Sequence, residues 1–301
     1  MSTREFVMIK PIQIEPAAQN VNLERFRHLL RRLARSRNVV IGTFILLIII
    51  ILTTFAPWIT PYDPIQVIPA DRLQPPGAAH IFGTDDFGRD IFTRVLYGGR
   101  LSLQVGLISI TLACTLGTAL GVLAGYYGGR TDAIVMRLMD VMLAFPGILL
   151  ALAIVAVLGK SLPNVMIAVG ISTIPVFTRI VRASTLSIKQ IDYITAAHAL
   201  GCPAWRIMFS HILPNVITPI IVIATNGIAG AIISGAALSF LGLGAQAPTP
   251  EWGIMLSEGR VYLRSAAWIT TFPGLSIMVT VLSINLLGDG LRDVLDPRLR
   301  I

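Results

Sequence analysis

Charged side chains are scarce in this chain. Asp, Glu, Lys and Arg make up 13% of its 301 residues, whereas 54% are hydrophobic. No Asp, Glu, Lys or Arg occurs between Arg206 and Glu251. So little charge and so long an apolar stretch exclude an ordinary soluble protein and are typical of a polytopic helical membrane protein. We therefore expect an all-α fold embedded in a membrane.

Cysteine and histidine are also few. Cys114 lies in an apolar run and Cys202 in a more polar stretch, so the pair predicts no disulfide and no metal site. The four histidines show no ligand spacing, and the acidic cluster Asp85, Asp86 and Asp90 fits no EF-hand pattern. We expect no metal ion and no cofactor bound by this chain.

Catalytic and nucleotide-binding motifs are missing. There is no GxxxxGK[ST], HExxH or GxSxG motif and no plausible Ser/His/Asp set, so we predict no catalytic residues and no enzyme activity. The centres of the apolar runs also lack Asp, Glu, Lys and His, which ion-coupled carriers usually hold near the midplane. Asp140 is the one candidate, and near the end of its run we expect it to pair with Arg137. A self-contained carrier or channel is therefore the less favoured class.

Six apolar runs approach or exceed the length of about 20 residues that a membrane-spanning helix needs. They are approximately Val39–Ile59, Leu101–Tyr126, Ala133–Leu158, Asn164–Val181, a run that begins near Val216, and Trp268–Leu287. The run after Val216 exceeds one span, so its glycine-rich end, Gly235–Gly244, is a candidate for a bend or a re-entrant piece inside the protein.

Basic residues predict the orientation of these spans. With the N-terminus inside, most of the 24 Lys and Arg residues fall in cytoplasmic segments, and the outside holds only Arg72, Arg89, Arg94, Arg100, Lys160, Arg260 and Arg264. This bias follows the positive-inside rule and places both termini in the cytoplasm. The net charge of +8 is thus mostly a topology signal, and nucleic-acid binding is not expected.

The orientation divides the chain into five parts. These are a cytoplasmic basic segment (1–37), the first transmembrane helix (38–60), an extracytoplasmic segment (61–99), a transmembrane domain (100–290) with a patterned loop at 184–214, and a cytoplasmic tail (291–301). The first apolar run lacks a small-residue cleavage site behind it, so we expect a membrane anchor rather than a cleaved signal peptide. Residues 23–37 form a candidate basic amphipathic helix that lies on anionic lipid headgroups.

The extracytoplasmic segment carries alternating carboxylates and arginines. Asp85 or Thr84 is expected to cap a helix that begins near Phe87, while Arg89 and Arg94 pair with the carboxylates. A lid or a docking surface for an outside partner is the functional alternative for this segment.

The most informative stretch is 192–215, a moderately polar segment between two apolar runs. Gly201 predicts the end of a short helix, because a left-handed C-cap residue costs least as glycine. Pro203 suits the first turn of a second helix, which Leu213-Pro214 is expected to end. Apolar residues recur at helical spacing at Tyr193, Ala196, Ala197 and Leu200. The pattern predicts a helix–turn–helix against the membrane face with one apolar side open to a partner; an ordinary loop covering the base of the bundle is the alternative.

These residues resemble a known family, the permease subunits of bacterial ATP-binding-cassette importers of the dipeptide, oligopeptide and nickel class, and within it the C-type permease. Four blocks carry the resemblance and cover the chain from Phe82 to its end. They are FGTDDFGRDIFTRVLYGGRLSL (82–103), the loop motif matched at Ala196, Ala197, Gly201, Leu213 and Pro214, LSFLGLG with PTPEWGIML (238–244 and 248–256), and NLLGDGLRDVLDPRLR (285–300).

The resemblance implies a type I importer permease fold with cytoplasmic coupling helices, in a bacterial or archaeal cytoplasmic membrane. It implies a heterodimer with a second homologous permease, two cytoplasmic ATP-binding subunits that hold ATP and magnesium, and an extracytoplasmic solute-binding protein. The solute is left open among dipeptides, oligopeptides, glutathione, nickel and other small solutes, and no substrate-binding residue is identified.

The resemblance also implies a site for coupling to the ATPase. It lies in the 191–214 loop and comprises Thr195, Ala196, Ala197, Gly201, His211, Leu213 and Pro214. Two of these residues depart from the general motif. Thr195 replaces the acidic residue that opens the motif, which puts one contact to the ATPase in doubt, and His211 stands where the general motif has Ile.

Overall fold

The computed structural model describes Arg27 and residues 31–295, and this part of the chain is helical with no strand. The N-terminal segment 1–37 and the tail 291–301 therefore lie mostly outside the described residues. The helices are α2 (Arg37–Thr54), α3 (Ala56–Ile59), α4 (Ile91–Tyr127), α5 (Gly129–Leu143), α6 (Gly147–Leu158), α7 (Leu162–Lys189), α8 (Asp192–Ala199), α9 (Ala204–Arg206), α10 (Leu213–Phe240), α11 (Trp252–Gly259) and α12 (Trp268–Leu295). Short 3-10 turns occur at Pro69–Asp71 and Arg260–Tyr262, and a π-helical turn, η2, covers Ile207–Ile212.

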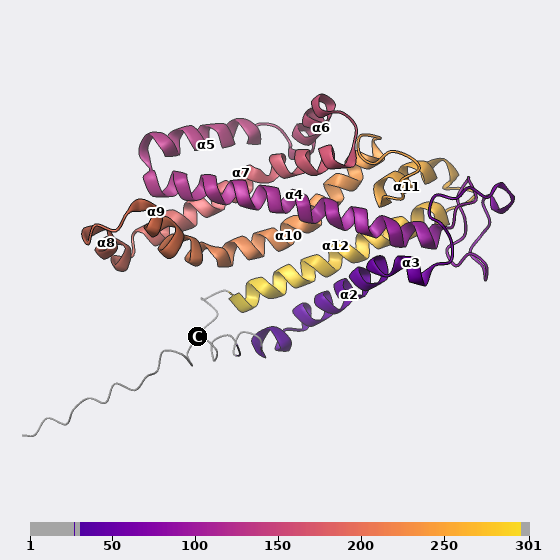
Figure 1. Ribbon diagram of the computed structural model, residues 1–301, viewed down its shortest axis with the longest axis horizontal. Coiled ribbons are helices and arrows are strands. Elements are labelled where there is room, and N and C mark those ends of the chain that lie inside the picture. Colours follow the sequence, from indigo (N-terminus) through magenta and orange to yellow (C-terminus); the bar gives the residue numbers. More distant parts are fainter. Residues whose placement is uncertain (1–26, 28–30, 296–301) are drawn as a thin grey trace, which may run out of the picture.

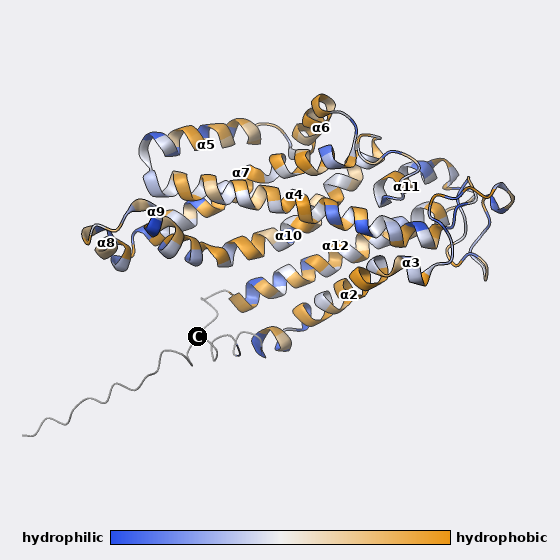
Figure 2. Cartoon of the chain, in the orientation of Figure 1, coloured by the Kyte–Doolittle hydropathy of each residue, from blue (hydrophilic) through white to orange (hydrophobic). Residues whose placement is uncertain are grey.

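The long helices form an elongated bundle. Figure 1 shows α4, α7, α10 and α12 running along its long axis, with α2 beside α12. Helices α8 and α9 lie at one end of the bundle, here called the α8 end. The loops of residues 61–90 and helix α11 lie at the other end, the α11 end. Hydrophobic residues dominate the length of the bundle in Figure 2, and hydrophilic ones gather toward both ends, as expected for helices that cross a lipid bilayer.

Five described helices are long and apolar enough to cross a membrane, and the bent pair α5 and α6 makes a sixth span when its two helices are taken together. The predicted continuous span 133–158 is therefore wrong in its shape. The pair is bent by 91°. The break lies at 144–146, where Pro146 lacks the N–H and has the fixed backbone that stop α5 from continuing. Pro146 then precedes the first turn of α6, a position that proline tolerates well.

Three other spans are longer than the sequence predicts. Helix α4 begins at Ile91 rather than Leu101, α7 extends to Lys189, and α12 extends to Leu295. At 1.5 Å per residue, the 37 residues of α4 reach about 55 Å, well beyond a hydrocarbon core of about 30 Å. Hydropathy detects only the part of a helix that lies in lipid, so the polar turns beyond it were missed.

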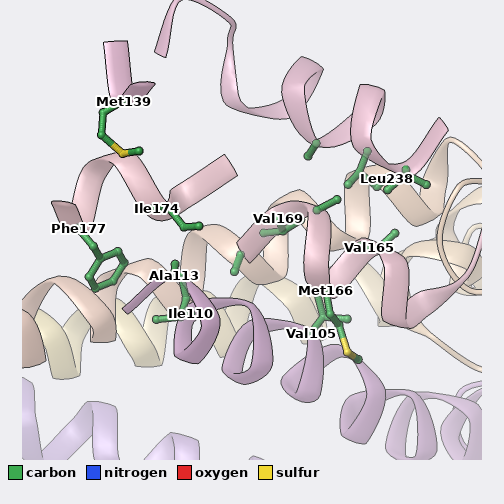
Figure 3. Close-up of a cluster of buried hydrophobic side chains, with 14 residues drawn as sticks. Val105, Ile110, Ala113, Met139, Val165, Met166, Val169, Ile174, Phe177 and Leu238 are labelled. Carbon is green, nitrogen blue, oxygen red and sulfur yellow. The ribbon is translucent and has the colours of Figure 1, made fainter. Parts of the chain in front are cut away.

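The centre of the core lies between α4 and α7. Figure 3 shows Phe177 and Ile174 of α7 facing the same cluster as Ile110 and Ala113 of α4. A stripe of glycines allows the close approach. A Cβ on Gly121 would lie 2.7 Å from the Thr178 carbonyl oxygen, and Gly117 and Gly125 make similar approaches one turn away.

The extracytoplasmic helix that the sequence predicts to begin near Phe87 is the first part of α4, and it begins at Ile91 instead. Asp90, not Asp85 or Thr84, is its N-cap and accepts a hydrogen bond of 2.7 Å from the Thr93 N–H. Asp85 instead accepts hydrogen bonds from the Phe87 and Arg89 N–H groups in the preceding turn. A helix from Phe87 is prevented because Gly88 has a left-handed φ of 75°.

The predicted pairing of Arg89 and Arg94 with carboxylates is confirmed. Arg89 Nε lies 2.6 Å from Asp85, and both arginines contact Glu258 Oε2, at 3.0 and 3.1 Å. Both guanidinium groups are buried. This network joins the 61–90 loop and the start of α4 to α11, which explains why two arginines and their carboxylates are retained in the interior of this end.

The predicted pair Asp140–Arg137 is wrong. Asp140 contacts Arg179 of α7 at 2.6 Å. Arg182, one turn further along α7, forms a second ion pair with Asp132 of α5. Asp140 and Arg137 are only three residues apart on α5, but α7 lies beside α5 and presents arginines to it.

The bend predicted for the glycine-rich segment Gly235–Gly244 lies beyond the end of α10 rather than within the helix. Helix α10 continues to Phe240, and the chain then turns at 241–245, where Gly242 has a φ of 77°. Helix α11 packs back on the end of α10, so closely that a Cβ on Gly253 would lie 2.4 Å from the Ala236 carbonyl oxygen. The predicted bend or re-entrant piece is thus a turn followed by a short returning helix.

Candidate functional site

The predicted helix break at Gly201 is confirmed in its geometry. Gly201 has a φ of 76°. Its N–H donates to the His198 carbonyl and the Cys202 N–H donates to the Ala197 carbonyl, both at 3.0 Å. These two bonds form a Schellman motif, which ends α8 and satisfies two of its last carbonyl groups. Pro203 follows as the residue before α9.

The predicted end of the second helix at Leu213-Pro214 is wrong. Helix α9, the π-helical turn η2 and α10 form one continuous helical run from Ala204 to Phe240. Proline lacks an N–H, and its ring crowds the carbonyl group four residues earlier. The wide turn of Ile207–Ile212 lies just before Pro214 and accommodates it, as single π-turns do within α-helices. The turn at Gly201 is therefore attached directly to a membrane-spanning helix.

The helix–turn–helix is anchored by buried isoleucines. Ile194 of α8 and Ile207 and Ile212 of η2 are almost fully buried. They belong to one cluster with Val122 of α4 and Val181 of α7. Burying a side chain of this size stabilises its position by about 1.5–3 kcal/mol. The unit is therefore held to three membrane helices rather than hanging from them as a mobile loop.

Several large apolar side chains of the same unit are exposed. Leu200, at the turn, has 88% of its surface exposed, and Trp205 has 62%. Other large exposed apolar side chains on this unit are Ile191, Tyr193 and Phe209. An exposed patch of this kind is typical of an interaction site. One apolar side open to a partner stays a prediction. We call these five residues the α8-end patch.

Two side-chain contacts that the sequence did not predict meet at Tyr126, and one of them connects α8 to the bundle. The Tyr126 hydroxyl, at the end of α4, lies 3.0 Å from His198 Nε2. Lys189 Nζ, at the end of α7, donates to the Tyr126 carbonyl at 2.6 Å. No sequence pattern relates Tyr126 to His198, because the two are separated by 72 residues.

A second polar contact joins α8 to the start of α10. Asn215 Nδ2 donates to the Tyr193 hydroxyl at 3.1 Å and to the His211 carbonyl at 2.6 Å. The rings of Tyr193 and His211 meet edge to face, with centroids 6.1 Å apart. These contacts fix the angle between α8 and the helix that leaves the site for the membrane.

The seven predicted site residues all lie in this unit at the α8 end (Figure 1). Thr195 and Ala196 are exposed on α8, and Gly201 is exposed in the turn. The others are Ala197, His211 and Leu213, which are half-buried, and Pro214, which is exposed. Among the described residues, no group of three His, Cys, Asp or Glu side chains is placed to hold a metal ion.

The fold is that of a multi-pass helical membrane protein with several exposed apolar side chains on the helix–turn–helix at one end. Comparison with known proteins gives the class: the chain belongs to the family described as binding-protein-dependent transport system inner membrane component, which it matches over residues 117–301. Residues 25–76 match the N-terminal transmembrane domain of oligopeptide transport permease C.

Several curated relatives are similar over nearly the whole chain. The dipeptide transport system permease protein DppC of Alkalihalophilus pseudofirmus is 50% identical over 97% of this chain and 96% of the relative. The glutathione transport system permease protein GsiD of Pectobacterium atrosepticum is 48% identical over 91% of this chain and 92% of the relative. The dipeptide transport system permease protein DppC of Haemophilus influenzae is 44% identical over 88% of this chain and 92% of the relative.

The resemblance to C-type permeases of this importer class is therefore confirmed. The chain is an inner-membrane, multi-pass permease of an ATP-binding-cassette importer. Permeases of this family work with ATPase and binding-protein partners.

Proposed function

We propose that this chain forms half of the translocation pathway of an ATP-driven importer of dipeptides and oligopeptides, with glutathione among the candidate solutes. The names of its relatives support this solute class. The observation that carries the coupling role is the α8-end patch, an exposed apolar face on a rigidly anchored helix–turn–helix. Coupling to the ATPase takes place through the 191–214 loop.

The buried side chains that anchor the helix–turn–helix make it rigid. A unit fixed by buried Ile194, Ile207 and Ile212 moves as a rigid body, whereas a loose loop would absorb a displacement of its tip. The continuous helix from Ala204 to Phe240 carries such a displacement into the membrane. Closure of the ATPase pair on the patch thereby changes the arrangement of the spanning helices.

The predicted coupling residues divide by their positions. Thr195 and Ala196 present a small, mostly apolar surface on α8, and Gly201 sets the turn. His211 and Pro214 hold the junction with α10. The hydroxyl of Thr195 replaces the acidic contact of the general motif with a neutral one.

The proposed assembly contains a second, homologous permease, two cytoplasmic ATP-binding subunits and an extracytoplasmic binding protein. ATP and magnesium are bound by the ATP-binding subunits, and this chain is a non-catalytic component. The bias of basic residues supports an orientation with the α8 end and both termini in the cytoplasm. The α11 end, with its buried ion network, then faces the binding protein.

The alternative solutes are nickel and other small solutes carried by importers of the same architecture. A self-contained carrier or channel is the less favoured class. Asp140, the one acidic candidate for ion coupling, pairs with Arg179 between α5 and α7, and both side chains are about half exposed.

The test is purification of the tagged chain from its native membrane, followed by reconstitution in proteoliposomes. We expect a homologous permease and ATPase subunits to co-purify, and ATP-dependent uptake of labelled dipeptide with its binding protein. Uptake of nickel but not of peptide would show that the solute is nickel rather than a peptide. Recovery of this chain alone, under conditions that preserve a control complex, would overturn the importer assembly.

A matched pair of variants tests the patch itself. Leu200→Glu places a charge on the patch and is expected to release the ATPase subunits. Val261→Glu changes a similarly exposed residue, 72% exposed, at the α11 end and is expected to leave them bound. Retention of the ATPase subunits by Leu200→Glu would contradict docking at this surface.

A further inference from the structure

A cavity of about 390 Å³ lies between the spanning helices α2, α4 and α12, toward the α11 end of the bundle (Figure 1). We call this cavity the α2 crevice. Its volume falls within the roughly 300–1,000 Å³ that ligand sites usually occupy. The α2 crevice lies at the opposite end of the bundle from the α8-end patch, and nothing in the proposed coupling mechanism uses it.

Helix α2 packs on the bundle near its two ends but not along its middle. Its buried residues are Val39 and Gly42 near the start and Thr53 near the end, and no residue between Gly42 and Thr53 is buried. At the first contact a Cβ on Gly42 would lie 2.6 Å from the Ser283 carbonyl oxygen of α12, so the backbones there are very close. Ile49 lies between the two contacts and lines the crevice. An occupant of the crevice would therefore complete the packing of α2.

The wall of the α2 crevice offers no unused hydrogen-bond donor. Its three hydroxyl groups belong to Thr53, Ser276 and Thr280, and each donates to a carbonyl group of its own helix, at 3.1, 2.8 and 2.7 Å. The ring N–H of Trp252 donates to the Val95 carbonyl at 2.9 Å. The other lining side chains are hydrocarbon, and none is charged. A buried water molecule needs two to four polar partners, so this wall suits a hydrocarbon chain.

The crevice opens toward lipid rather than toward water. At the end nearest the 61–90 loop, Phe82 stacks on Phe272 with centroids 3.9 Å apart and meets Phe92 edge to face at 5.0 Å. Leu52 of α2 and Leu275 of α12 also line the crevice, and they are 36% and 44% exposed. Both leucines belong to helices that cross the membrane. An occupant therefore enters between α2 and α12 from the bilayer.

Arg100 places a positive charge beside the crevice. Its Nε donates to the Thr53 carbonyl and its Nη2 to the Thr54 carbonyl, both at 2.6 Å, so the guanidinium group caps the end of α2. Within the described part of the chain this arginine forms no ion pair with a carboxylate. Trp58, just beyond α2, is 79% exposed and marks this level as the membrane–water interface. Lipid phosphates lie at that level, and a guanidinium group binds phosphate through paired hydrogen bonds.

We propose that the α2 crevice binds one acyl chain of an anionic phospholipid from the leaflet at the α11 end, and that Arg100 contacts the phosphate of this lipid. The inference goes beyond the proposed function, because it concerns no transported solute. The acyl chain fills the space beside the middle of α2, so the lipid holds the first spanning helix against α4 and α12. A free phosphate would supply the charge but not the hydrocarbon that the crevice requires.

Native mass spectrometry of the complete transporter tests the acyl-chain site, after delipidation in mild detergent and addition of dioleoylphosphatidylglycerol. Val279→Trp fills the crevice from α12, whereas Met278→Trp places the same side chain at an exposed neighbouring position outside it. The wild type and Met278→Trp are expected to retain one phosphatidylglycerol more per copy of this chain than Val279→Trp. Glycerol 3-phosphate, which is the headgroup source without acyl chains, is expected not to compete.

Thermal unfolding of the same complex tests the contact with Arg100. Phosphatidylglycerol is compared with dioleoylphosphatidylcholine, whose choline group offsets the phosphate charge. For the wild type we expect the rise in unfolding temperature to reach half its maximum at an at least fivefold lower concentration of phosphatidylglycerol. Arg100→Gln keeps a donor for a carbonyl group of α2 but removes the charge, and is expected to abolish that difference. Val279→Trp without lipid is expected to be at least as stable as the delipidated wild type, because the indole ring fills the crevice.

Each part of the proposal has an outcome that contradicts it. Equal phosphatidylglycerol counts for the wild type and Val279→Trp would overturn the acyl-chain site, and would assign the crevice to a side chain of the second permease. Equal titration midpoints of the two lipids in the wild type, or a preference that survives in Arg100→Gln, would overturn the phosphate contact. Neither measurement depends on uptake, so a failure of the lipid site is distinguishable from a failure of the proposed function.

Discussion

The Tyr126 hydroxyl at the end of α4 and His198 Nε2 on α8 lie 3.0 Å apart, with their rings nearly parallel. Lys189 of α7 contacts the backbone carbonyl of the same tyrosine and also lies over its ring. One side chain therefore connects the proposed coupling helix to two membrane helices. A displacement of α8 reaches α4 through this contact as well as through the buried Ile194.

Removing the Tyr126 hydroxyl should weaken coupling. Tyr126→Phe keeps the ring and deletes one hydrogen bond with a net value of about 0.5–1.5 kcal/mol. Peptide uptake per ATP hydrolysed is expected to fall roughly two- to tenfold while ATPase activity persists. Tyr127→Phe is the control, because that neighbouring side chain is exposed and makes no comparable contact to α8. Equal coupling ratios for the two variants would contradict the role of Tyr126.

Gly201→Val should also uncouple ATP hydrolysis from transport. A Cβ at Gly201 would meet nothing within 4 Å, so the variant acts only through its left-handed backbone, at a cost of about 1–2 kcal/mol. Gly201→Asn, which tolerates this conformation, is expected to be milder. Gly242→Val imposes the same strain at the α11 end, where φ is 77° and the space is also open. Uptake and ATPase assays should show a coupling defect for Gly201→Val and none for Gly242→Val.

Breaking the buried ion network at the α11 end should destabilise the protein. Arg94→Met leaves Glu258 with one arginine fewer and removes hydrogen bonds to the carbonyls of Pro64 and Pro248. The free energy of unfolding is expected to fall by about 3 kcal/mol or more, because removing one member of a buried ion network leaves the remaining charges and the two carbonyl groups incompletely compensated. Denaturation of the purified complex measures this, with exposed Arg264→Gln as control. A fall of less than 1 kcal/mol in the free energy of unfolding would contradict this prediction and show that water or structural relaxation compensates for the missing guanidinium group.

Glu251 should give stability a dependence on pH. This carboxyl, in the loop before α11, is 1% exposed, and burial raises its pKa above the ordinary value. The neutral form is therefore favoured in the folded protein. Its stabilising contribution is fully present below the ordinary pKa and is lost as pH rises through the raised, folded-state pKa.

Thermal unfolding of the wild type and of Glu251→Gln tests the effect, measured from below the ordinary pKa of a glutamate to above the raised pKa of Glu251. The wild type is expected to lose stability as pH rises, and the amide variant should lack that component while keeping the hydrogen bond with Ser102. Parallel profiles for the two proteins would show that Glu251 does not titrate in this range.

Local signals in the chain predicted a large part of the fold. The six apolar runs located the spans because hydropathy depends on composition alone, and Gly201 located the turn because few other residues adopt its conformation. Helix ends were less predictable. The capping role of Asp90 and the break at Pro146 depend on which of several nearby signals the surrounding structure satisfies.

The candidate site was predicted in position but not in its contacts. The loop motif located α8, the turn and the junction with α10, but the continuation through Pro214 was missed because a π-helical turn leaves no recognisable pattern. Asp140 was matched with the wrong arginine for a related reason. A charge on one helix has candidate partners on its own helix and on every neighbour, and spacing ranks only those on its own.

The sequence by itself determined that this is a polytopic helical membrane protein with a patterned helix–turn–helix, because span length, apolar content and glycine conformation are local properties. Only the tertiary structure decided that Tyr126 meets His198, that Arg94 meets Glu258, and that Arg100 meets the carbonyl groups at the end of α2. Those contacts depend on how each helix is rotated and tilted. Side chains on several helices set these angles together, among them the glycines that bring α4 against α7.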